Sequence, residues 1–259
     1  MGWKELQSGE IHFGIAAAET QRFGFPVLNV QCGVKVVENI YSIGKTLIEQ
    51  DYGLAVVRYP SSIETVGSLL ASLDMQLIST DSIVYWSSSN KTTFAAASSR
   101  VDIQQVGVDR LSDLVRTVQS SFAGYRSHWH YNPRTNHVEM AEAYSEWVTN
   151  FINRQDIYCY IISVGIHLAG MAMVQSSGEI AEILLAGIVR EYQSQGLYQN
   201  LISYVEHDLR QKSAKQIVIS TQSQNVRVQK SWARYGLVPQ MSVQTIHVEK
   251  KERRDHYSV

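Results

Sequence analysis

The spacing of hydrophobic residues in the first part of the chain switches between a helical and a strand period. Two helices are predicted from apolar residues that recur every three or four positions: Val36, Ile40, Ile43 and Leu47, then Ile63, Val66, Leu70 and Leu73. A strand is predicted at residues 54–57 between them, and another over Met75–Trp86. From Phe25 to Trp86 the order is therefore strand, helix, strand, helix, strand, which is an α/β unit.

The rest of the chain predicts a sheet with interleaved helices. Strands are expected at 102–108, 179–189, 216–221 and 242–248, and helices at 110–119, 197–211 and 225–235. Another helix follows Pro133, where one apolar stripe contains Met140, Tyr144, Trp147 and Phe151. We interpret these aromatic residues as core.

The stretch 157–174 is mostly apolar and almost long enough to span a bilayer. Its β-branched and aromatic residues break near Gly165 into two runs of strand length. We therefore predict a buried hairpin. A polar segment, SSSNKTT at 87–93, marks a seam between an N-terminal α/β lobe at 1–100 and a second domain at 101–259.

Charge and cysteine content exclude several classes of partner. The formal net charge is -1 and the pI is about 6.7, so the chain lacks a positive field that would attract nucleic acid polymers or anionic membranes. Cys32 and Cys159 fit neither a disulfide framework nor metal-ligand spacing, so no metal is expected and a reducing cytoplasm fits best. The N-terminus lacks an apolar signal core, and the KKERRD run at 250–255 is expected to be a solvated tail.

Chemistry is concentrated after the strand that ends at Val189. A short polar loop leads into the helix predicted from Leu197, so the loop amides lie at a helix N-terminus. Such a terminus binds phosphate, because its first N–H groups lack intrahelical partners and the helix dipole is positive there. Gly196 lets the backbone approach a pyrophosphate closely.

Gln193-x-x-Gly196 between a strand and a helix resembles the pyrophosphate loop Q/R-x-x-G-x-G/A of the GCN5-related N-acyltransferases (GNATs). Asn225, Trp232 and Gly236 resemble the family's following helix, which carries Asn, Tyr and Gly. The resemblance implies a GNAT fold, α/β with a mixed, largely antiparallel sheet, and direct acyl transfer from acyl-CoA. It implies these acyl-CoA-binding residues: Ile188, Val189, Gln193, Ser194, Gln195, Gly196, Leu197, Tyr198, Asn225 and Trp232. A strand-edge N–H near Ile188 or Val189 would hold the thioester carbonyl.

Two residues depart from the family pattern. Tyr198 stands where the loop usually carries Gly or Ala, and Trp232 stands where many members carry the Tyr that protonates the CoA thiolate. An indole N–H is a donor but not an acid in this range. Tyr235, almost one helical turn further, is the substitute candidate, although a thiol of pKa about 8.5 also leaves without obligatory protonation.

Three further segments resemble the dTDP-amino-sugar N-acyltransferase branch of the family. They are residues 19–26 (ETQRFGFP), 127–133 (SHWHYNP) and 144–148 (YSEWV). This resemblance implies a nucleotide-linked 3-amino or 4-amino deoxysugar as acceptor. It also implies that the N-terminal lobe forms the sugar side of the cleft, and that the protein is a homodimer.

Attack on the thioester needs a neutral amine, so a proton must leave through a side chain or water. Glu19 and His130 are the candidate bases, although His130 could equally pack in the core and Glu19 could bond backbone. Candidates for nucleotide binding are Arg22, Arg126 and Arg134 for the pyrophosphate and Phe23 for the base. The arginines could equally be surface charges.

Two other functions stay open. One is a GNAT that acts on a peptide, antibiotic or polyamine amine, and the other is a non-catalytic acyl-CoA-binding module, which the departures at Tyr198 and Trp232 favour. The acyl group, acetyl or 3-hydroxybutanoyl, is likewise open.

Overall fold

The structure, a computed structural model, describes residues 2–35, 40–88 and 101–251, and its described residues form two compact units. Unit 1 comprises the described residues of Met1–Ile83, His128–His137 and Met241–Val259. Unit 2 comprises the described residues of Val84–Ser127 and Val138–Gln240. Residues 128–137 and those from 241 onward thus belong with the N-terminal unit, whereas the division by sequence placed them in the second domain.

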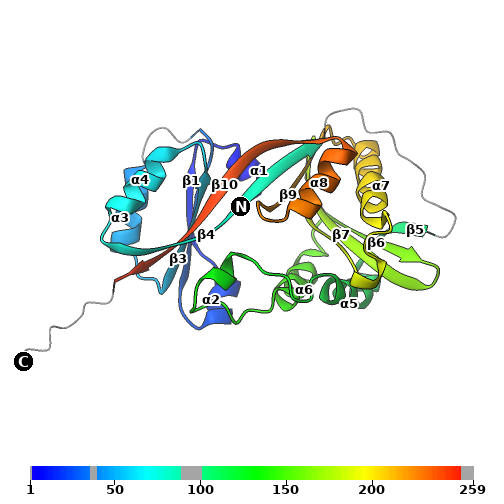
Figure 1. The fold of residues 1–259 in the computed structure, drawn as a ribbon, viewed down its shortest axis with the longest axis horizontal. Coiled ribbons are helices and arrows are strands. Elements are labelled where there is room, and N and C mark those ends of the chain that lie inside the picture. Colours follow the sequence, from blue (N-terminus) through cyan, green and yellow to red (C-terminus); the bar gives the residue numbers. More distant parts are fainter. Residues whose placement is uncertain (1, 36–39, 89–100, 252–259) are drawn as a thin grey trace, which may run out of the picture. The chain divides into compact units, whose positions relative to one another are not determined.

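Unit 1 is built on strands in the order β1-β2-β3-β10-β4. Its elements are α1 (Trp3–Leu6), β1 (Ile11–Ile15), α2 (Ala17–Phe23), β2 (Val27–Cys32), α3 (Tyr41–Glu49), β3 (Leu54–Pro60), α4 (Glu64–Ser72), the 3-10 turn η2 (His128–Tyr131), and parts of β4 (Met75–Ser88) and β10 (Leu237–Lys250). β2 runs parallel to β3, β1 runs antiparallel to β2, and β10 runs antiparallel to β3. α3 and α4 lie side by side (Figure 1) and bury Ile43, Leu47, Val66 and Leu70 in a core with β2, β3 and β10.

Unit 2 contains strands in the order β9-β8-β7-β6-β5. Its elements are β5 (Val101–Val106), η1 (Val108–Arg110), α5 (Leu111–Ser121), α6 (Met140–Phe151), β6 (Ile157–Val164), β7 (His167–Ser177), β8 (Ile180–Ile188), η3 (Arg190–Tyr192), α7 (Leu197–Gln211), β9 (Gln216–Gln222) and α8 (Val226–Tyr235). β5 to β8 are antiparallel and β8 is parallel to β9. The sheet of the described residues is thus mixed and largely antiparallel, which confirms the predicted fold class.

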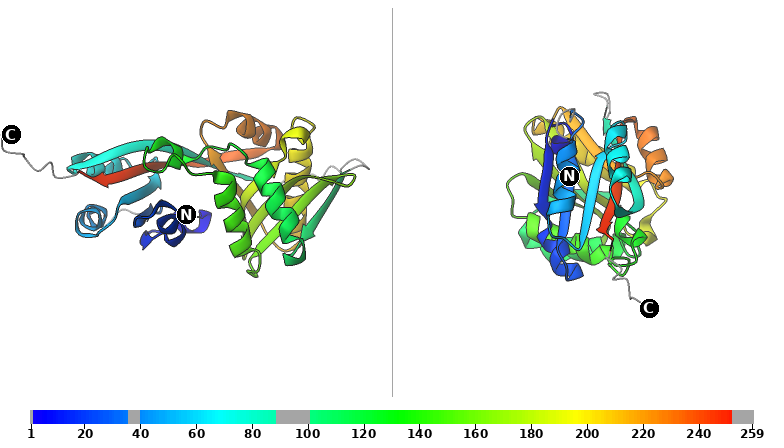
Figure 2. Two further views of the ribbon diagram at one scale, coloured as in Figure 1. Left: turned by 90° about the horizontal axis from the view of Figure 1, so that it is seen from below. Right: turned by 90° about the vertical axis from the view of Figure 1, so that its left-hand side faces the viewer.

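Alternation along β7 places helices on both faces of the unit 2 sheet. Ala172 and Val174 lie in one core cluster with the buried face of α7. Met171 and Met173 point the other way, into a cluster with α5 and α6, which pack against each other (Figure 2). From the stripe of α6, the partly buried Tyr144, Trp147 and Phe151 pack against this second cluster, which confirms their interpretation as core.

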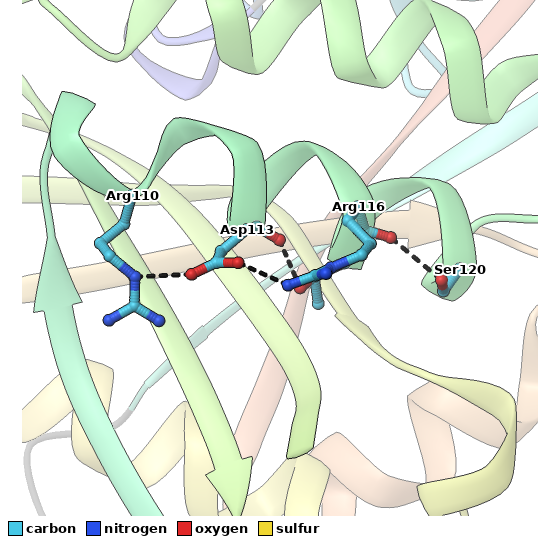
Figure 3. A network of polar contacts seen from close by, with 5 residues as sticks. Arg110, Asp113, Arg116 and Ser120 are labelled. Atoms are coloured by element: carbon cyan, nitrogen blue, oxygen red, sulfur yellow. Dashed lines mark hydrogen bonds and ion pairs between the residues drawn. The ribbon is translucent and has the colours of Figure 1, made fainter. Parts of the chain in front are cut away.

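A network of ion pairs stabilises the start of α5 without forming a site. Asp113 accepts from Arg110 Nε and from Arg116 Nη2, each at 2.6 Å, and Ser120 donates to the Arg116 carbonyl at 3.0 Å (Figure 3). The hydrogen bond from Arg110 is the main cause that lowers the pKa of Asp113. Both arginines are partly or largely exposed, so this is a surface network of modest energetic weight.

Most predicted elements are confirmed, including the helix Leu197–Gln211 and the hairpin of β6 and β7 around Gly165. Sequence reasoning missed α1, β1 and α2, which are short and lack a clear hydrophobic period. Val36, residues 89–100 with most of the predicted seam, and the tail beyond residue 251 lie outside the described residues. No helix in the described ranges is long and apolar enough to cross a membrane.

Candidate active site

The candidate site begins where β8 and β9 stop pairing. Their parallel register runs from Ile180–Gln216 to Ile183–Ile219, whereas β8 continues to Ile188. Within this stretch the register of β8 against β7 shifts between Met173 and Val174, as a β-bulge does. A bulge bends its strand and ends regular pairing. The residues of β8 that follow Ile183 therefore have one edge that is not paired with β9 in the register of the described residues.

Backbone hydrogen bonds show which amide faces that edge. The Val189 N–H donates to the Ala169 carbonyl at 2.9 Å, so it is directed at β7. Because N–H and C=O groups alternate between the two edges of a strand, those of Ile188 point away from β7. The Ile188 carbonyl accepts from Gln193 Nε2 at 3.0 Å. Of the two predicted oxyanion donors, the structure leaves Ile188 N–H on the unpaired edge, while Val189 N–H is engaged.

The loop between β8 and α7 is shaped by two residues with positive φ. Ser194 has φ 65° and Gly196, the N-cap of α7, has φ 78°. The loop is tied to itself, because Gln195 Nε2 donates to the Glu191 carbonyl at 3.2 Å. Backbone turned in this way, ahead of a helix of 15 residues, presents successive N–H groups to an anion. The role of Gln193 to Tyr198 at the cofactor stays a prediction.

Arg227 on α8 contacts this loop, and sequence reasoning missed it. Its Nη2 donates to Ser194 Oγ at 2.9 Å and its Nη1 to Gln193 Oε1 at 3.4 Å. A cation in the first turn of a helix is disfavoured by the helix dipole. That unfavourable position, two residues after Asn225, was the available sequence signal. The guanidinium adds positive charge to a loop that already presents amide donors.

Asn225 caps α8 and is fixed by a side-chain hydrogen bond. Its Nδ2 donates to Thr221 Oγ1 on β9 at 3.0 Å, and its backbone N–H donates to the Gln222 carbonyl at 2.9 Å. The predicted role of Asn225 at the cofactor stays a prediction. The observed role is to set where α8 begins relative to β9.

The two departures from the family pattern contact each other. Trp232, which is 2% exposed, donates its indole N–H to the Tyr198 hydroxyl at 3.1 Å. Its ring also packs edge-on against Trp86, with centroids 6.1 Å apart. Burial raises the pKa of Tyr198. Since the Tyr198 oxygen accepts from the indole, its own proton is available to another acceptor.

Tyr235, the substitute acid predicted from sequence, has a different environment. Its hydroxyl lies 2.7 Å from Glu206 Oε2, and the other oxygen of Glu206 accepts from Arg210 at 2.6 Å. Glu206 is 2% exposed, so this phenol satisfies a buried carboxylate and ties α8 to α7. A role as the acid for CoA would require that bond to break.

The residues predicted for the acceptor divide between the units. Glu19, Arg22 and Phe23 lie on α2, His130 lies on η2, and all four belong to unit 1 together with Arg134. Phe23 packs against Trp129 with centroids 5.0 Å apart, which joins α2 to η2. Arg126 is exposed and belongs to unit 2.

Arg134 already has several partners within unit 1. Its Nη1 donates to the Gly53 carbonyl at 2.6 Å and lies 3.7 Å from Glu249 Oε1, and its guanidinium carbon lies 4.3 Å from the centre of the Phe25 ring. These contacts partly compensate its charge. Among the described residues, no group of three or more His, Cys, Asp or Glu side chains could hold a metal ion.

A loop with two positive φ angles at a helix N-terminus, beside an unpaired strand edge, is an arrangement suited to a CoA thioester. Residues 123–237 match the family described as Acetyltransferase (GNAT) family. The matched part of the chain contains the loop, α7 and α8. No curated protein matches the chain in sequence.

Solved structures share the fold at low sequence identity. A functionally unknown conserved protein from Staphylococcus epidermidis is 15% identical, with a TM-score of 0.64, and the alignment covers 94% of this chain and 92% of that one. A GCN5-related N-acetyltransferase from Sphaerobacter thermophilus is 10% identical, with a TM-score of 0.65 and coverage of 93% and 76%. A tandem GNAT protein from the clavulanic acid biosynthesis pathway is 12% identical, with a TM-score of 0.59 and coverage of 90% and 77%. These likenesses extend over both units and show the fold.

Proposed function

We propose that the protein transfers an acyl group from acyl-CoA to the amine of a dTDP-linked 3-amino or 4-amino deoxysugar. The observation that carries the acyl-CoA half is the loop Gln193–Gly196, held by Arg227, next to the Ile188 N–H on an unpaired strand edge. The GNAT match of residues 123–237 supports N-acetyltransferase activity. The sugar acceptor rests on the resemblance of segments 19–26, 127–133 and 144–148.

Acyl-CoA binding follows from the donors of the loop. The pyrophosphate accepts from the N–H groups at the start of α7, and Arg227 adds a cation. The thioester carbonyl accepts from the Ile188 N–H, which then stabilises the oxyanion of the tetrahedral intermediate. Losing one such donor costs about a hundredfold or more in rate.

The transfer itself is direct. The neutral amine attacks the thioester carbon, the C–N bond forms, and the C–S bond breaks to release the CoA thiolate. Glu19 or His130 takes the amine proton, directly or through water. Tyr198 donates its proton to the thiolate and recovers one from solvent. We place Tyr198 in this role because its oxygen already accepts from Trp232, whereas Tyr235 is bonded to Glu206.

The acceptor side uses unit 1. Arg22 and Arg134, with Arg126, are proposed to contact the nucleotide pyrophosphate, and Phe23 the thymine face. Arg134 has the weakest case of the three, because Glu249 already lies 3.7 Å from it. The acyl group is acetyl or 3-hydroxybutanoyl.

We also propose a homodimer in a reducing cytoplasm. Cys32 and Cys159 are both buried free thiols, and burial raises each pKa to about 12. Thiols of this kind are inert and need no oxidising compartment.

A panel of dTDP-3-amino and dTDP-4-amino deoxyhexoses, each with acetyl-CoA or 3-hydroxybutanoyl-CoA, tests the proposal. Release of free thiol is followed, and mass spectrometry confirms the amide. Turnover on one pair establishes the function and both substrates. Turnover on a peptide, antibiotic or polyamine amine instead would replace the sugar acceptor. CoA binding by calorimetry with no turnover on any amine would indicate a binding module.

A further inference from the structure

One face of the unit 1 sheet carries polar residues in register across four strands. His12 on β1 pairs with Gln31 on β2, Gln31 with Arg58 on β3, and Arg58 with Thr245 on β10. His247 lies two residues after Thr245, so it points to the same face. A polar row of this kind is unexpected in a largely buried sheet.

The opposite face of the same strands is an ordinary apolar core. Ala55, Val57 and Val248 alternate with the polar residues and pack with α3 and α4. The polar face is approached instead by η2, through His128 and Trp129. The Trp129 ring lies 5.3 Å from that of His247. On this face Thr245 and His247 are each 0% exposed, whereas His12, Gln31 and Arg58 are half-buried.

Hydrogen bonds determine the tautomers of both histidines. Arg58 Nη2 lies 2.8 Å from His128 Nε2, and an arginine can only donate, so this nitrogen accepts and His128 carries its proton on Nδ1. His128 Nδ1 then donates to His247 Nε2, 2.8 Å away. His247 must therefore be neutral with its proton on Nδ1. Both imidazoles are uncharged, and the Arg58 guanidinium is the positive charge of this chain of hydrogen bonds.

The chain ends in donors without acceptors. Arg58 Nε, His247 Nδ1 and Thr245 Oγ1 are all buried with no hydrogen-bond partner in the described structure. Arg58 also takes part in none of the ion pairs between described residues of unit 1. Buried hydrogen-bond donors are normally satisfied, and a buried donor without a partner costs free energy. The cluster therefore has two buried N–H donors and one buried hydroxyl without a hydrogen-bond partner in the described residues, beside the positive charge of Arg58, whose Nη2 contacts His128.

We propose that this face of unit 1 binds the carboxylate of a small organic acid through Arg58, Thr245 and His247. A carboxylate is singly charged and balances the one guanidinium. It offers about four acceptor positions, enough for the three donors. A phosphate group shares this chemistry but brings a second charge at neutral pH, which two neutral imidazoles would leave uncompensated.

The test uses acetate as the probe, with chloride at the same ionic strength as reference. Nitrogen-15 spectra of the histidine side chains report the His247 Nδ1 proton directly, and the thermal midpoint reports binding. Acetate is expected to shift the His247 signal saturably and to raise the midpoint. Arg58→Gln should weaken acetate binding by about tenfold or more, and Thr245→Val by about threefold to tenfold. Lys45→Gln, which removes an exposed cation from α3, is the matched control and should bind as the wild type does.

The Thr245→Val variant keeps the proposal testable even if Arg58→Gln does not fold. Valine has the shape of threonine, and where no ligand binds, loss of an unpartnered buried hydroxyl leaves stability unchanged or raised. Equal midpoint shifts in wild type and both variants would mean an adventitious ion only. A response to phosphate but not to acetate would overturn the carboxylate assignment. Acyl transfer is measured by thiol release, so the two proposals fail separately.

Discussion

The loop Gln193–Gly196 and the Arg58–His128–His247 cluster both collect hydrogen-bond donors, but they arise in different ways. The donors of the loop are mainly backbone N–H groups from consecutive residues, and the sequence motif predicts them. The cluster joins side chains from β3, η2 and β10, which are separated by 70 and 119 residues. Local backbone geometry can be read from a motif, whereas a buried side-chain cluster depends on strand register.

The largest effect is expected from Gly196→Ala, which tests whether loop geometry carries acyl-CoA binding. The residue has φ 78°, which costs a non-glycine residue about 1–2 kcal/mol, and the added methyl group would also lie where the pyrophosphate approaches. We expect kcat/KM for acyl-CoA to fall about a hundredfold.

Gly178→Ala is the matched control for this prediction. Gly178 has φ 65° and, like Gly196, open space where a Cβ would be, so the backbone strain is similar. Both variants should lose similar stability in thermal melts, and the Gly196 variant alone should lose activity. Equal activities would show that the loop does not bind the cofactor.

The second prediction concerns pH and the buried histidines. Burial and then the Arg58 charge lower the pKa of His247 to about 3, and the pKa of His128 is also well below its usual value. Between pH 6.5 and about 3 the unfolded chain binds protons that the folded chain does not, so stability falls as pH falls through this window. The slope is about 1.4 kcal/mol per pH unit for each histidine.

Chemical unfolding at pH 7.5, 6.5 and 5.5 measures this slope. His247→Gln should reduce it relative to wild type, because glutamine does not titrate. Stability that is the same at pH 7.5 and 5.5, or an unchanged slope in the variant, would mean that the histidines are not buried in neutral form.

The third prediction separates the two phenols of the site. Tyr198→Phe should lower kcat about tenfold, because it removes the proposed acid. Trp232→Phe should lower kcat less, because it removes only the indole N–H that holds the Tyr198 hydroxyl. The double variant should be little worse than Tyr198→Phe, since the two side chains act through one hydrogen bond.

Tyr235→Phe provides the contrast. It leaves the buried Glu206 without one donor, so we expect a loss of about 1–3 kcal/mol in unfolding free energy with kcat retained. A larger kcat loss for Tyr235→Phe than for Tyr198→Phe would reverse the assignment of the acid.

The smallest effect is expected from Arg227→Gln. Its charge supplements amide donors that remain in place, so the KM for acyl-CoA should rise about fivefold to tenfold, with little change in kcat. The effect should shrink at high salt, because Arg227 is exposed. Lys230→Gln, an exposed lysine on the same helix, is the control, and an equal KM change there would assign the effect to general charge.

The elements that could be predicted from the sequence are those with a long hydrophobic period or a local motif. α7, α5 and the hairpin of β6 and β7 are confirmed because each buries one face that repeats regularly. β1 and α2 could not be predicted, because β1 has little burial and α2 buries no residue completely. Arg227 was missed because the motif covers backbone donors and says nothing about which side chain from α8 reaches the loop.

The sequence by itself determined the α/β class and the position of the loop before α7, since both follow from spacing within a few residues of each other. Tertiary structure decided the composition of unit 1, which gains residues 128–137 and 241 onward. It also decided the bond between Trp232 and Tyr198 and the row from His12 to Thr245. These features depend on strand order and on parallel or antiparallel register, where a shift of one residue turns every side chain to the other face. No local pattern contains that information, because it belongs to pairs of segments far apart in the chain.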